Sequence, residues 1–342
     1  MKFKKILSMS LVLSMALLAG CSKEEKSYSD ISVGLVVAEG HIDDEGRNKE
    51  IWRGLKRAKE ELGVEISYEE PKEEDYVTTL EKLIGEETDL IVCVGEPIKE
   101  SLKEVANAYT DKQFAIVDEV YDIPVGNIAQ VTFKEEEGAY LAGALAAKIT
   151  ETNSIGFIGD MPDKITDRYK YGFKAGLESI NPKIKLEDKY TNTEWDKSIE
   201  GQIAKDMYAT DIDIIFSVAG NAGAEAIKAA KEANKLAIGV DENRRELAPD
   251  NLLTSVLKKY NIAIFNVVKD FGDGNLKFGE VNRYGLESGA ISLSDGLSKH
   301  VSEEVSESIN EISEEIQKGE DSDIKIPKTE HEYNNINKVE FK

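Results

Sequence analysis

Cysteine is nearly absent from this chain of 342 residues, which contains only Cys21 and Cys93. Cys93 lies in the apolar run 89–94 (DLIVCV), which predicts a central strand, so its thiol is expected to be buried and unreactive. A disulfide would need Cys21 as the partner, and Cys21 lies in a segment with a different predicted role. The fold is therefore expected to be stabilised by packing and not by disulfide bonds.

Basic residues and histidines are also scarce. Lysine and arginine number 43 against 66 aspartates and glutamates, for a net charge of -23, and no basic stripe is present, so nucleic acid is not expected as a partner. The three histidines (His41, His300 and His331) are too widely separated for a metal-ligand pattern. No G-x-S-x-G, H-E-x-x-H or Walker lysine motif occurs, so neither an enzyme nor a cofactor is expected.

Long apolar runs are missing except near the N-terminus, where residues 6–18 are almost entirely apolar. This run is too short to span a bilayer, but it follows three lysines and has the form of an export signal covering residues 1–20. The signal ends in LAGC (residues 18–21), which resembles the bacterial lipobox. The resemblance implies a mature chain anchored by a lipid on Cys21 to the extracytoplasmic face of the cell membrane. An ordinary secretory signal with an incidental cysteine is the alternative.

Residues 22–30 are polar and show no apolar periodicity, so residues 21–30 are interpreted as a lipidated cysteine and a tether. A flexible tether of this length would hold the domain about 15–20 Å from the lipid. After it, short β-rich runs alternate with helical patterns. Strands are predicted at 31–37, 64–68, 90–94 and 114–117, and helices at 48–62, 76–84 and 98–109. This order predicts a parallel sheet with helices on both faces.

The same alternation is repeated after residues 127–133. Helices are predicted at 135–149, 169–179, 198–209 and 223–234, and strands at 154–158, 185–190, 212–217 and 236–240. The sequence therefore predicts two similar α/β lobes in tandem. Open parallel sheets bind ligands at the carboxyl ends of their strands, so the ligand is expected in a cleft between the lobes.

The remaining chain is expected to cross back and complete both sheets. A helix at 262–271 and a glycine-rich stretch at 272–279 precede an acidic amphipathic helix at about 301–317. Lobe 1 is assigned to residues 31–131 plus about 252–285, and lobe 2 to residues 132–251 plus about 286–327. Residues 328–342 show no periodicity and are interpreted as a loose polar tail.

Five segments form a specific combined pattern: 114–118 (FAIVD), 131–141 (VTFKEEEGAYL), 156–159 (GFIG), 237–241 (AIGVD) and 253–258 (LTSVLK). Together they resemble the basic membrane protein (Bmp) family, the PnrA-like nucleoside-binding lipoproteins of ABC transporters. The resemblance covers about residues 31–294. It implies a type I periplasmic-binding-protein fold, in which two doubly wound parallel-sheet lobes joined by three hinge strands close on a ligand. It also implies that the ligand is a nucleoside of the purine class and that the partners are ABC permease subunits. A monomer is expected.

Four residues match positions that bind the ligand in this family. Asp241 matches a ribose-binding aspartate, and a carboxylate suits this role because it can accept hydrogen bonds from two hydroxyls. Asp118 matches a second binding aspartate. Lys258 matches a lysine that can donate to the ligand and hold a carboxylate in place. Tyr169 stands where the family commonly has a base-stacking phenylalanine, and a tyrosine can stack equally well.

A small-residue segment completes this half of the predicted site. Gly220, Asn221 and Gly223 open a helix after a strand, where backbone amides can approach a ligand closely. The segment lacks the G-x-G-x-x-G and P-loop patterns. Each predicted site residue also has an ordinary explanation, since aspartates at strand ends often cap helices, lysines are often solvated and tyrosines often pack in a core. Only their joint match favours a ligand site.

The first lobe departs from the family pattern. Ala38, followed by Glu39, stands where the family has an aspartate, and Arg47 replaces a stacking phenylalanine. Asp44 and Asn48 keep the surrounding pattern, so these positions and Arg47 are included in the predicted ligand site. An arginine can stack on a base, but its charge also suits an anionic group.

Two further departures are Glu96, in a turn where the family has an apolar or small residue, and Asp160, in place of the second glycine of a Gly-Gly-Met motif. The altered first lobe leaves open a regulatory or sensory lipoprotein of the competence-regulator branch, with which residues 190–196 (YTNTEWD) are compatible. A glycosidase or nucleosidase on this scaffold would need an activated carboxylate near a bound water, and nothing in the sequence requires one. The leading prediction is a lipid-anchored receptor that binds a nucleoside or a related small polar ligand between its lobes and presents it to an ABC permease.

Overall fold

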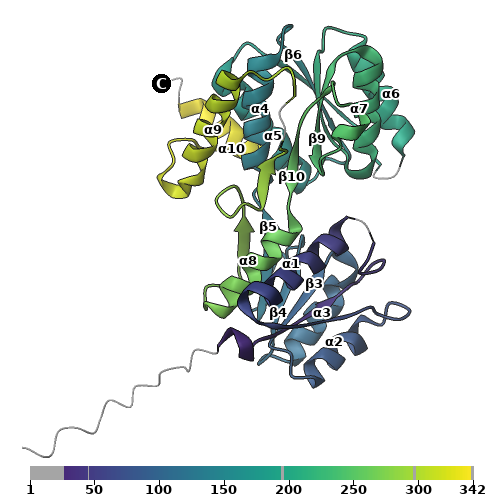
Figure 1. Ribbon diagram of the computed structural model, residues 1–342, viewed down its shortest axis with the longest axis vertical. Coiled ribbons are helices and arrows are strands. Elements are labelled where there is room, and N and C mark those ends of the chain that lie inside the picture. Colours follow the sequence, from purple (N-terminus) through teal and green to yellow (C-terminus); the bar gives the residue numbers. More distant parts are fainter. Residues whose placement is uncertain (1–26, 45, 194–195, 296–297, 340–342) are drawn as a thin grey trace, which may run out of the picture.

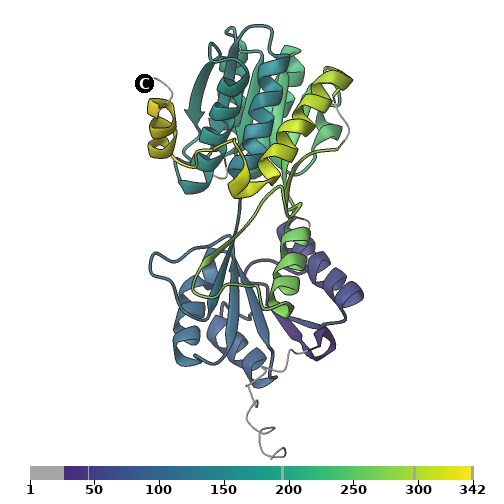
Figure 2. The ribbon, with the colours of Figure 1, turned by 90° about the vertical axis from the view of Figure 1, so that its left-hand side faces the viewer.

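The computed structural model describes residues 27–339 except 45, 194–195 and 296–297. Two α/β lobes are stacked along the longest axis and are joined by narrow crossing segments (Figure 1). Figure 2 shows the same two bodies and the waist between them from the side. The two doubly wound lobes predicted from the sequence are therefore confirmed.

Lobe 1 is built on a parallel sheet with the strand order β11-β5-β4-β3-β1-β2. Helices α1 and α8 pack together on one face, and α2 and α3 cover the other. In α1, Ile51, Leu55 and Ala58 form the buried stripe, and Gly63 ends the helix in a left-handed conformation. The strands are β1 (Ser32–Val36), β2 (Glu65–Glu69), β3 (Leu90–Val94), β4 (Gln113–Val117), β5 (Ile128–Phe133) and β11 (Val281–Tyr284); the helices are α1 (Arg47–Leu62), α2 (Tyr76–Gly85), α3 (Lys99–Ala108) and α8 (Tyr260–Gly272).

Lobe 2 repeats this plan with the order β12-β10-β9-β8-β6-β7, in which only the short edge strand β12 is antiparallel. Helices α4 and α5 pack on one face of the sheet, with α9 against α4 and α10 against α5, while α6 and α7 pair on the other face (Figure 1). The strands are β6 (Ser154–Gly159), β7 (Lys185–Tyr190), β8 (Ile214–Val218), β9 (Leu236–Asp241), β10 (Leu252–Lys258) and β12 (Ile291–Leu293); the helices are α4 (Glu135–Ile149), α5 (Lys164–Ile180), α6 (Lys197–Tyr208), α7 (Gly223–Ala233), α9 (Glu303–Gln317) and α10 (Glu330–Val339).

Five single turns of 3-10 helix connect or extend these elements: η1 (Tyr28–Asp30), η2 (Glu96–Ile98), η3 (Gly220–Ala222), η4 (Arg245–Leu247) and η5 (Gly319–Asp321). Two of them, η2 and η3, follow the carboxyl ends of β3 and β8 directly. They therefore lie on the sides of the two sheets where parallel α/β folds bind ligands.

The chain crosses between the lobes three times: from β5 into α4, from β10 into α8, and from β11 to β12. The sequence analysis placed residues 252–258 in lobe 1, but the structure differs. Strand β10 lies in the second sheet between β9 and β12, with Ser255 opposite Gly239, and the chain returns to lobe 1 only with α8. Apolar periodicity predicts a strand but does not say which sheet it joins, because that depends on long-range pairing.

The C-terminal segment also differs from its prediction as a loose polar tail. Residues 330–339 form α10, whose Tyr333 packs against Tyr171 with 5.8 Å between the ring centroids. The Tyr333 hydroxyl donates to Glu178, 2.6 Å from Oε1. This helix is held mainly by one aromatic side chain, so the sequence lacks the repeated apolar spacing that would have indicated it.

Helices α4 and α5 pack closely against each other because glycines lie at their contact. The α carbon of Gly143 faces the backbone of Phe173, and that of Gly176 faces the backbone of Tyr140. The many alanines and glycines of α4 permit this close approach. The sequence analysis predicted that α5 starts at residue 169, five residues too late. The helix starts earlier because the Asp163 side chain caps it by accepting from the amides of Ile165 and Thr166.

We predict that Gly176→Ala destabilises lobe 2, because the new methyl group would overlap the backbone oxygen of Tyr140. The expected loss in the free energy of unfolding is about 3 kcal/mol, measured by urea denaturation. Gly85→Ala is the matched control. Gly85 is also a helical glycine, the last residue of α2, but no atom lies within 4 Å of the added carbon. It should leave stability unchanged or raise it by up to about 1 kcal/mol. Equal effects of the two substitutions would contradict the packing argument.

Candidate functional site

Two aspartates occupy equivalent positions in the two lobes. Asp118 follows β4 and Asp241 ends β9, and β4 and β9 hold the same place in the two strand orders. Both have left-handed backbone conformations, with φ of 66° and 65°. This conformation is strained for residues other than glycine and is concentrated at functional sites. Both strands end on the side of their sheet that faces the other lobe, so the structure brings these two predicted site residues to the interlobe junction.

A buried lysine connects the lobes at this junction. The Nζ atom of Lys258, at the end of β10 in lobe 2, lies 2.7 Å from Oδ1 of Asp118 in lobe 1. The same atom lies 3.5 Å from Oε1 of Glu135, the first residue of α4. The exposed fractions of the three side chains are 7%, 12% and 0%. Lys258 therefore fulfils the predicted role of holding a carboxylate, and its ammonium group is already engaged by the protein.

Aromatic rings complete the surroundings of the Lys258 ammonium group. It lies 4.7 Å from the ring centre of Phe133 and 5.4 Å from that of Tyr260. The Tyr260 hydroxyl donates to Oδ2 of Asp118. Burial lowers the pKa of Lys258, but the carboxylates of Asp118 and Glu135, together with the phenol oxygen of Tyr260, outweigh burial and hold this pKa well above its ordinary value. The lysine is therefore charged at physiological pH.

Three consecutive buried glutamates begin α4, and each contacts a different part of the hinge. Oε2 of Glu135 lies 2.7 Å from Nε of Arg168 on α5. Glu136 accepts two hydrogen bonds of 2.8 Å from Arg283 on β11 in lobe 1. Glu137 accepts from the backbone amide of residue 286, in the crossing from β11 to β12, at 2.9 Å. The sequence contained this signal as the EEE run of residues 135–137, but the sequence analysis used it only to recognise the family.

Asp241 differs from its neighbours because no hydrogen bond or ion pair to its carboxylate is found within the described part of the chain. Burial raises its pKa, while the charge of Lys258 acts in the opposite direction. Asp118 and Glu135 are satisfied by protein groups, so Asp241 is the carboxylate of the cluster that can accept from a ligand.

Tyr169 lies beside Asp241 but does not present an open ring face. Its side chain is on α5, only 3% exposed, and packs edge-on against Phe216 with 6.1 Å between centroids. Its hydroxyl is buried and has no hydrogen-bond partner within the part of the chain that the structure describes. In this conformation the ring is therefore part of the core, and the stacking role predicted from the sequence is not seen.

The predicted residues of the first lobe mainly stabilise their own loop. The Asn48 amide donates to the carbonyl of Glu39 at 2.7 Å, and Asp44 accepts from the backbone amide of His41 at 2.6 Å. Arg47 lies 3.5 Å from the Glu39 carboxylate. Among the described residues, no hydrogen bond or ion pair joins Asp44, Arg47 or Asn48 to the cluster around Lys258. Their partners are local, and spacing in the sequence could not reveal them.

The small-residue segment lies on the lobe 2 side of the junction. Gly220 has a positive φ of 49° in η3, its carbonyl accepts from Arg244 at 3.0 Å, and Gly223 begins α7. The side chain of Asn221 and the whole of Cys21 lie outside the described residues. Asp160 caps the turn after β6, where its Oδ1 accepts from the backbone amide of residue 161 at 2.6 Å.

Comparison with known proteins identifies the family. The model of PnrA-like ABC transporter substrate-binding proteins, named Bmp, matches residues 31–330. The chain belongs to the Bmp family. Substrate-binding proteins of ABC transporters bind small-molecule ligands outside the cytoplasm and interact with permease components.

Relatives and solved structures agree with this assignment. The Bmp chain is 35% identical over 297 residues to basic membrane protein A of Borreliella burgdorferi, covering 84% of this chain and 86% of the relative. It is 32% identical over 329 residues to a CD4+ T-cell-stimulating antigen of Listeria innocua, covering 90% of both. Two solved structures share the fold at 24% identity: a solute-binding protein of an ABC transporter system from Aeropyrum pernix (TM-score 0.68, 90% and 96% coverage) and a transcriptional activator of the comK gene from Bacillus halodurans (TM-score 0.72, 87% and 99%).

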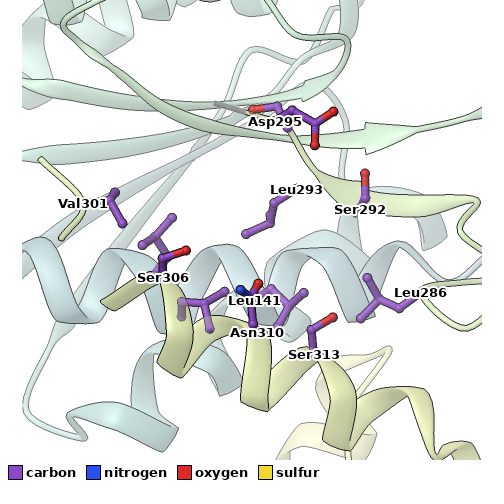
Figure 3. Close-up of a pocket in the computed structure, with 12 residues that line it drawn as sticks. Leu141, Leu286, Ser292, Leu293, Asp295, Val301, Ser306, Asn310 and Ser313 are labelled. Carbon is purple, nitrogen blue, oxygen red and sulfur yellow. The ribbon is translucent and has the colours of Figure 1, made fainter. Parts of the chain in front are cut away.

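A cavity of about 310 Å³ in this Bmp protein lies away from the junction, in lobe 2 (Figure 3). Its lining comes from α4, β12 and α9, and the side chains of Leu141, Leu293 and Asn310 point toward it. None of the ligand-binding residues predicted from the sequence lines this cavity. Within the described ranges, no helix is both long and apolar enough to cross a membrane.

A second buried acid lies under the helix that follows the small-residue segment. Glu200 on α6 is 0% exposed, accepts from the Ser217 hydroxyl and has one carboxylate oxygen without a partner among the described residues. Burial raises the pKa of Glu200 to about 7, although the hydrogen bond from Ser217 and the charge of Arg244 act in the opposite direction. The sequence analysis missed Glu200, because a single acid in an amphipathic helix normally faces solvent.

We predict that Lys258→Met destabilises the protein strongly, because it leaves Asp118 and Glu135 as buried charges without the lysine. The expected loss in the free energy of unfolding is about 3–5 kcal/mol. Lys299→Met is the matched control, since Lys299 and Asp250 form an exposed pair with side-chain exposures of 59% and 71%. The control should change stability by less than about 1 kcal/mol. A similarly small effect of Lys258→Met would show that the junction does not depend on this charge.

We predict that stability falls as the pH rises from about 4.5 to about 7, because in this interval the folded protein holds a proton on Glu200 that the unfolded chain has released. A shift of this size corresponds to at most about 3 kcal/mol. Glu200→Gln should remove this part of the pH dependence in thermal unfolding, whereas Glu187→Gln, at a half-exposed position on β7, should retain it. An unchanged slope in Glu200→Gln would assign the effect to another group.

Proposed function

We propose that this Bmp protein is a lipid-anchored receptor that binds a nucleoside between its lobes and presents it to an ABC permease. The observation that carries the proposal is the Asp241 carboxylate, which is largely buried at the interlobe junction and lacks a protein partner among the described residues. A carboxylate at such a site is suited to a neutral ligand that has two adjacent hydroxyl donors. The ribose of a purine nucleoside has this feature.

The network around Lys258 supports closure on a ligand. Asp118 belongs to lobe 1 and Glu135 to lobe 2, and Lys258 contacts both. This arrangement fixes the Asp118 carboxylate and the ends of two crossing segments, so the lobes can rotate about a defined junction. A ligand that contacts both lobes only when they are close stabilises the closed state, which a permease can distinguish from the open state.

The anchoring part of the proposal is based on the LAGC sequence at residues 18–21 and places the receptor, as a monomer, on the extracytoplasmic face of the membrane. Strand β1 begins at Ser32, 11 residues after Cys21, so a lipid on Cys21 would keep lobe 1 close to the bilayer. The acidic composition, with a net charge of -23 for the full chain, would repel the domain from anionic headgroups. The lipid would therefore be the main membrane contact.

A regulatory lipoprotein without transport is the second candidate. It is favoured by the first lobe, where Arg47 is next to Glu39 and where Asp44 and Asn48 bond to their own loop. These contacts leave fewer groups for a base than the family pattern implies. The transcriptional activator of the comK gene from Bacillus halodurans, which shares the fold, has a regulatory role.

The proposal predicts that Asp241→Asn weakens nucleoside binding by about 10–150-fold, which corresponds to about 1.5–3 kcal/mol for hydrogen bonds to a charged group. Asparagine suits this position because it retains the shape and tolerates the left-handed backbone of Asp241. The measurement is isothermal titration of residues 22–342 with adenosine, guanosine, inosine and the pyrimidine nucleosides.

Asp250→Asn, at an exposed aspartate of the same lobe, is the control and should bind as the unmodified protein does. Equal affinity of Asp241→Asn and the unmodified protein would remove Asp241 from the site. Absence of binding by every nucleoside would contradict the receptor proposal and favour the regulatory alternative.

A further inference from the structure

The two lobes approach each other at a second place, away from the crossing segments. Glu242 of lobe 2 follows Asp241, the last residue of β9. Its Oε1 atom lies 3.8 Å from the point that a β carbon on Gly46 would occupy, and Gly46 is the N-cap of α1 in lobe 1. Strand β1, which leads into α1, is separated from the crossing strands β5 and β11 by β3 and β4. The approach of Glu242 to lobe 1 is therefore separate from the hinge.

The start of α1 presents positive charge to this carboxylate. Gly46 has no side chain, so the first turn of α1 is not capped by a side chain of its N-cap residue. The amino end of a helix carries a partial positive charge. Arg47 is the first residue of α1, and its Nη2 atom lies 3.5 Å from the Glu39 carboxylate. Its side chain remains 35% exposed, so the guanidinium group can attract a second carboxylate.

Within lobe 2, Arg244 orients the Glu242 carboxylate. The Nε atom of Arg244 lies 3.8 Å from Oε2 of Glu242, and its Nη1 atom donates to the Gly220 carbonyl at 3.0 Å. The Arg244 side chain is only 14% exposed, whereas that of Glu242 is 58% exposed. One carboxylate oxygen is therefore attracted by an arginine of its own lobe, while the other lies near α1. The same arginine connects this contact to the small-residue segment of the predicted ligand site.

We propose that Glu242 forms an electrostatic contact between the lobes, a latch, that favours their approach before any ligand is bound. The carboxylate of lobe 2 attracts the amino end of α1 and Arg47 in lobe 1, and this attraction is lost when the lobes separate. A charge beside a helix end changes an equilibrium by about 2–5-fold. An effect of this size changes the populations of two lobe arrangements that have similar free energies. The latch goes beyond the proposed function, because it requires no particular ligand.

The test measures the distance between two spin labels, one in each lobe, by double electron–electron resonance. The labels are attached to Lys56→Cys on α1 and Lys231→Cys on α7, which are exposed positions in different lobes (Figure 1). Residues 22–342 contain both lobes and lack Cys21, and Cys93 is fully buried, so only the introduced cysteines react. Without ligand, Glu242→Gln should raise the ratio of separated to close arrangements by about 2–5-fold.

Glu246→Gln is the matched control, because Glu246 is an exposed glutamate of the same loop region in lobe 2. It should leave the distances unchanged, and the melting temperatures of all three proteins should agree. Raising sodium chloride from about 20 mM to about 500 mM should shift the unmodified protein toward longer distances, because salt screens exposed charges. The same change should leave Glu242→Gln unaffected.

The latch is overturned if Glu242→Gln gives the same distances as the unmodified protein. It is also overturned if both glutamine variants shift equally, which would show a general effect of net charge, or if the distances in the unmodified protein do not depend on salt. Nucleosides are added in a separate measurement. If none of them shortens the distances, the receptor proposal fails, and the comparison of the ligand-free variants still decides whether the latch exists.

Discussion

The ion pairs of Lys258 are the constraint on which the two-lobe arrangement depends. A single ammonium group with 7% side-chain exposure satisfies one carboxylate from each lobe, Asp118 and Glu135. Burying such an ion pair is unfavourable unless every charge is paired and every carboxylate oxygen accepts a hydrogen bond. The geometry of the junction therefore has little freedom. The crossings that enter α4 and α8 are therefore fixed relative to each other, and relative motion of the lobes must take place around this point.

The hinge and the ligand site are parts of one polar cluster. Glu135, Glu136 and Glu137 each bind a different segment near the crossings, and the first of them also contacts the lysine that orients Asp118. The acidic first turn of α4 is also favoured by the helix dipole. This arrangement explains how a change at the ligand site can alter the preferred angle between lobes, since the same residues determine both.

Much of the fold was predictable because it depends on local patterns. The buried stripe of α1, the apolar strand β3 and the alternation of strands and helices all follow from periodicity in the sequence. The aspartates at 118 and 241 were predictable as site candidates because each lies at the end of an apolar strand and matches a ligand-binding position of the family that the sequence resembles. The contacts of Asn48, near the start of α1, were less predictable. Its side chain bonds to the backbone of the preceding loop, and the sequence pattern does not define the positions of those backbone atoms.

The sequence by itself determined the two-lobe class and the positions where strands end in polar residues, because short-range apolar spacing encodes these features, and the resemblance of five segments indicated the family. The tertiary structure decided which sheet receives β10, which charges are paired and which polar atoms remain unused. Tyr260 and Asp118 are 142 residues apart in the sequence and meet only when the chain has crossed between the lobes. Hydrogen bonds and ion pairs depend on distances of a few ångströms between such distant residues, and periodicity along the chain contains no information about those distances.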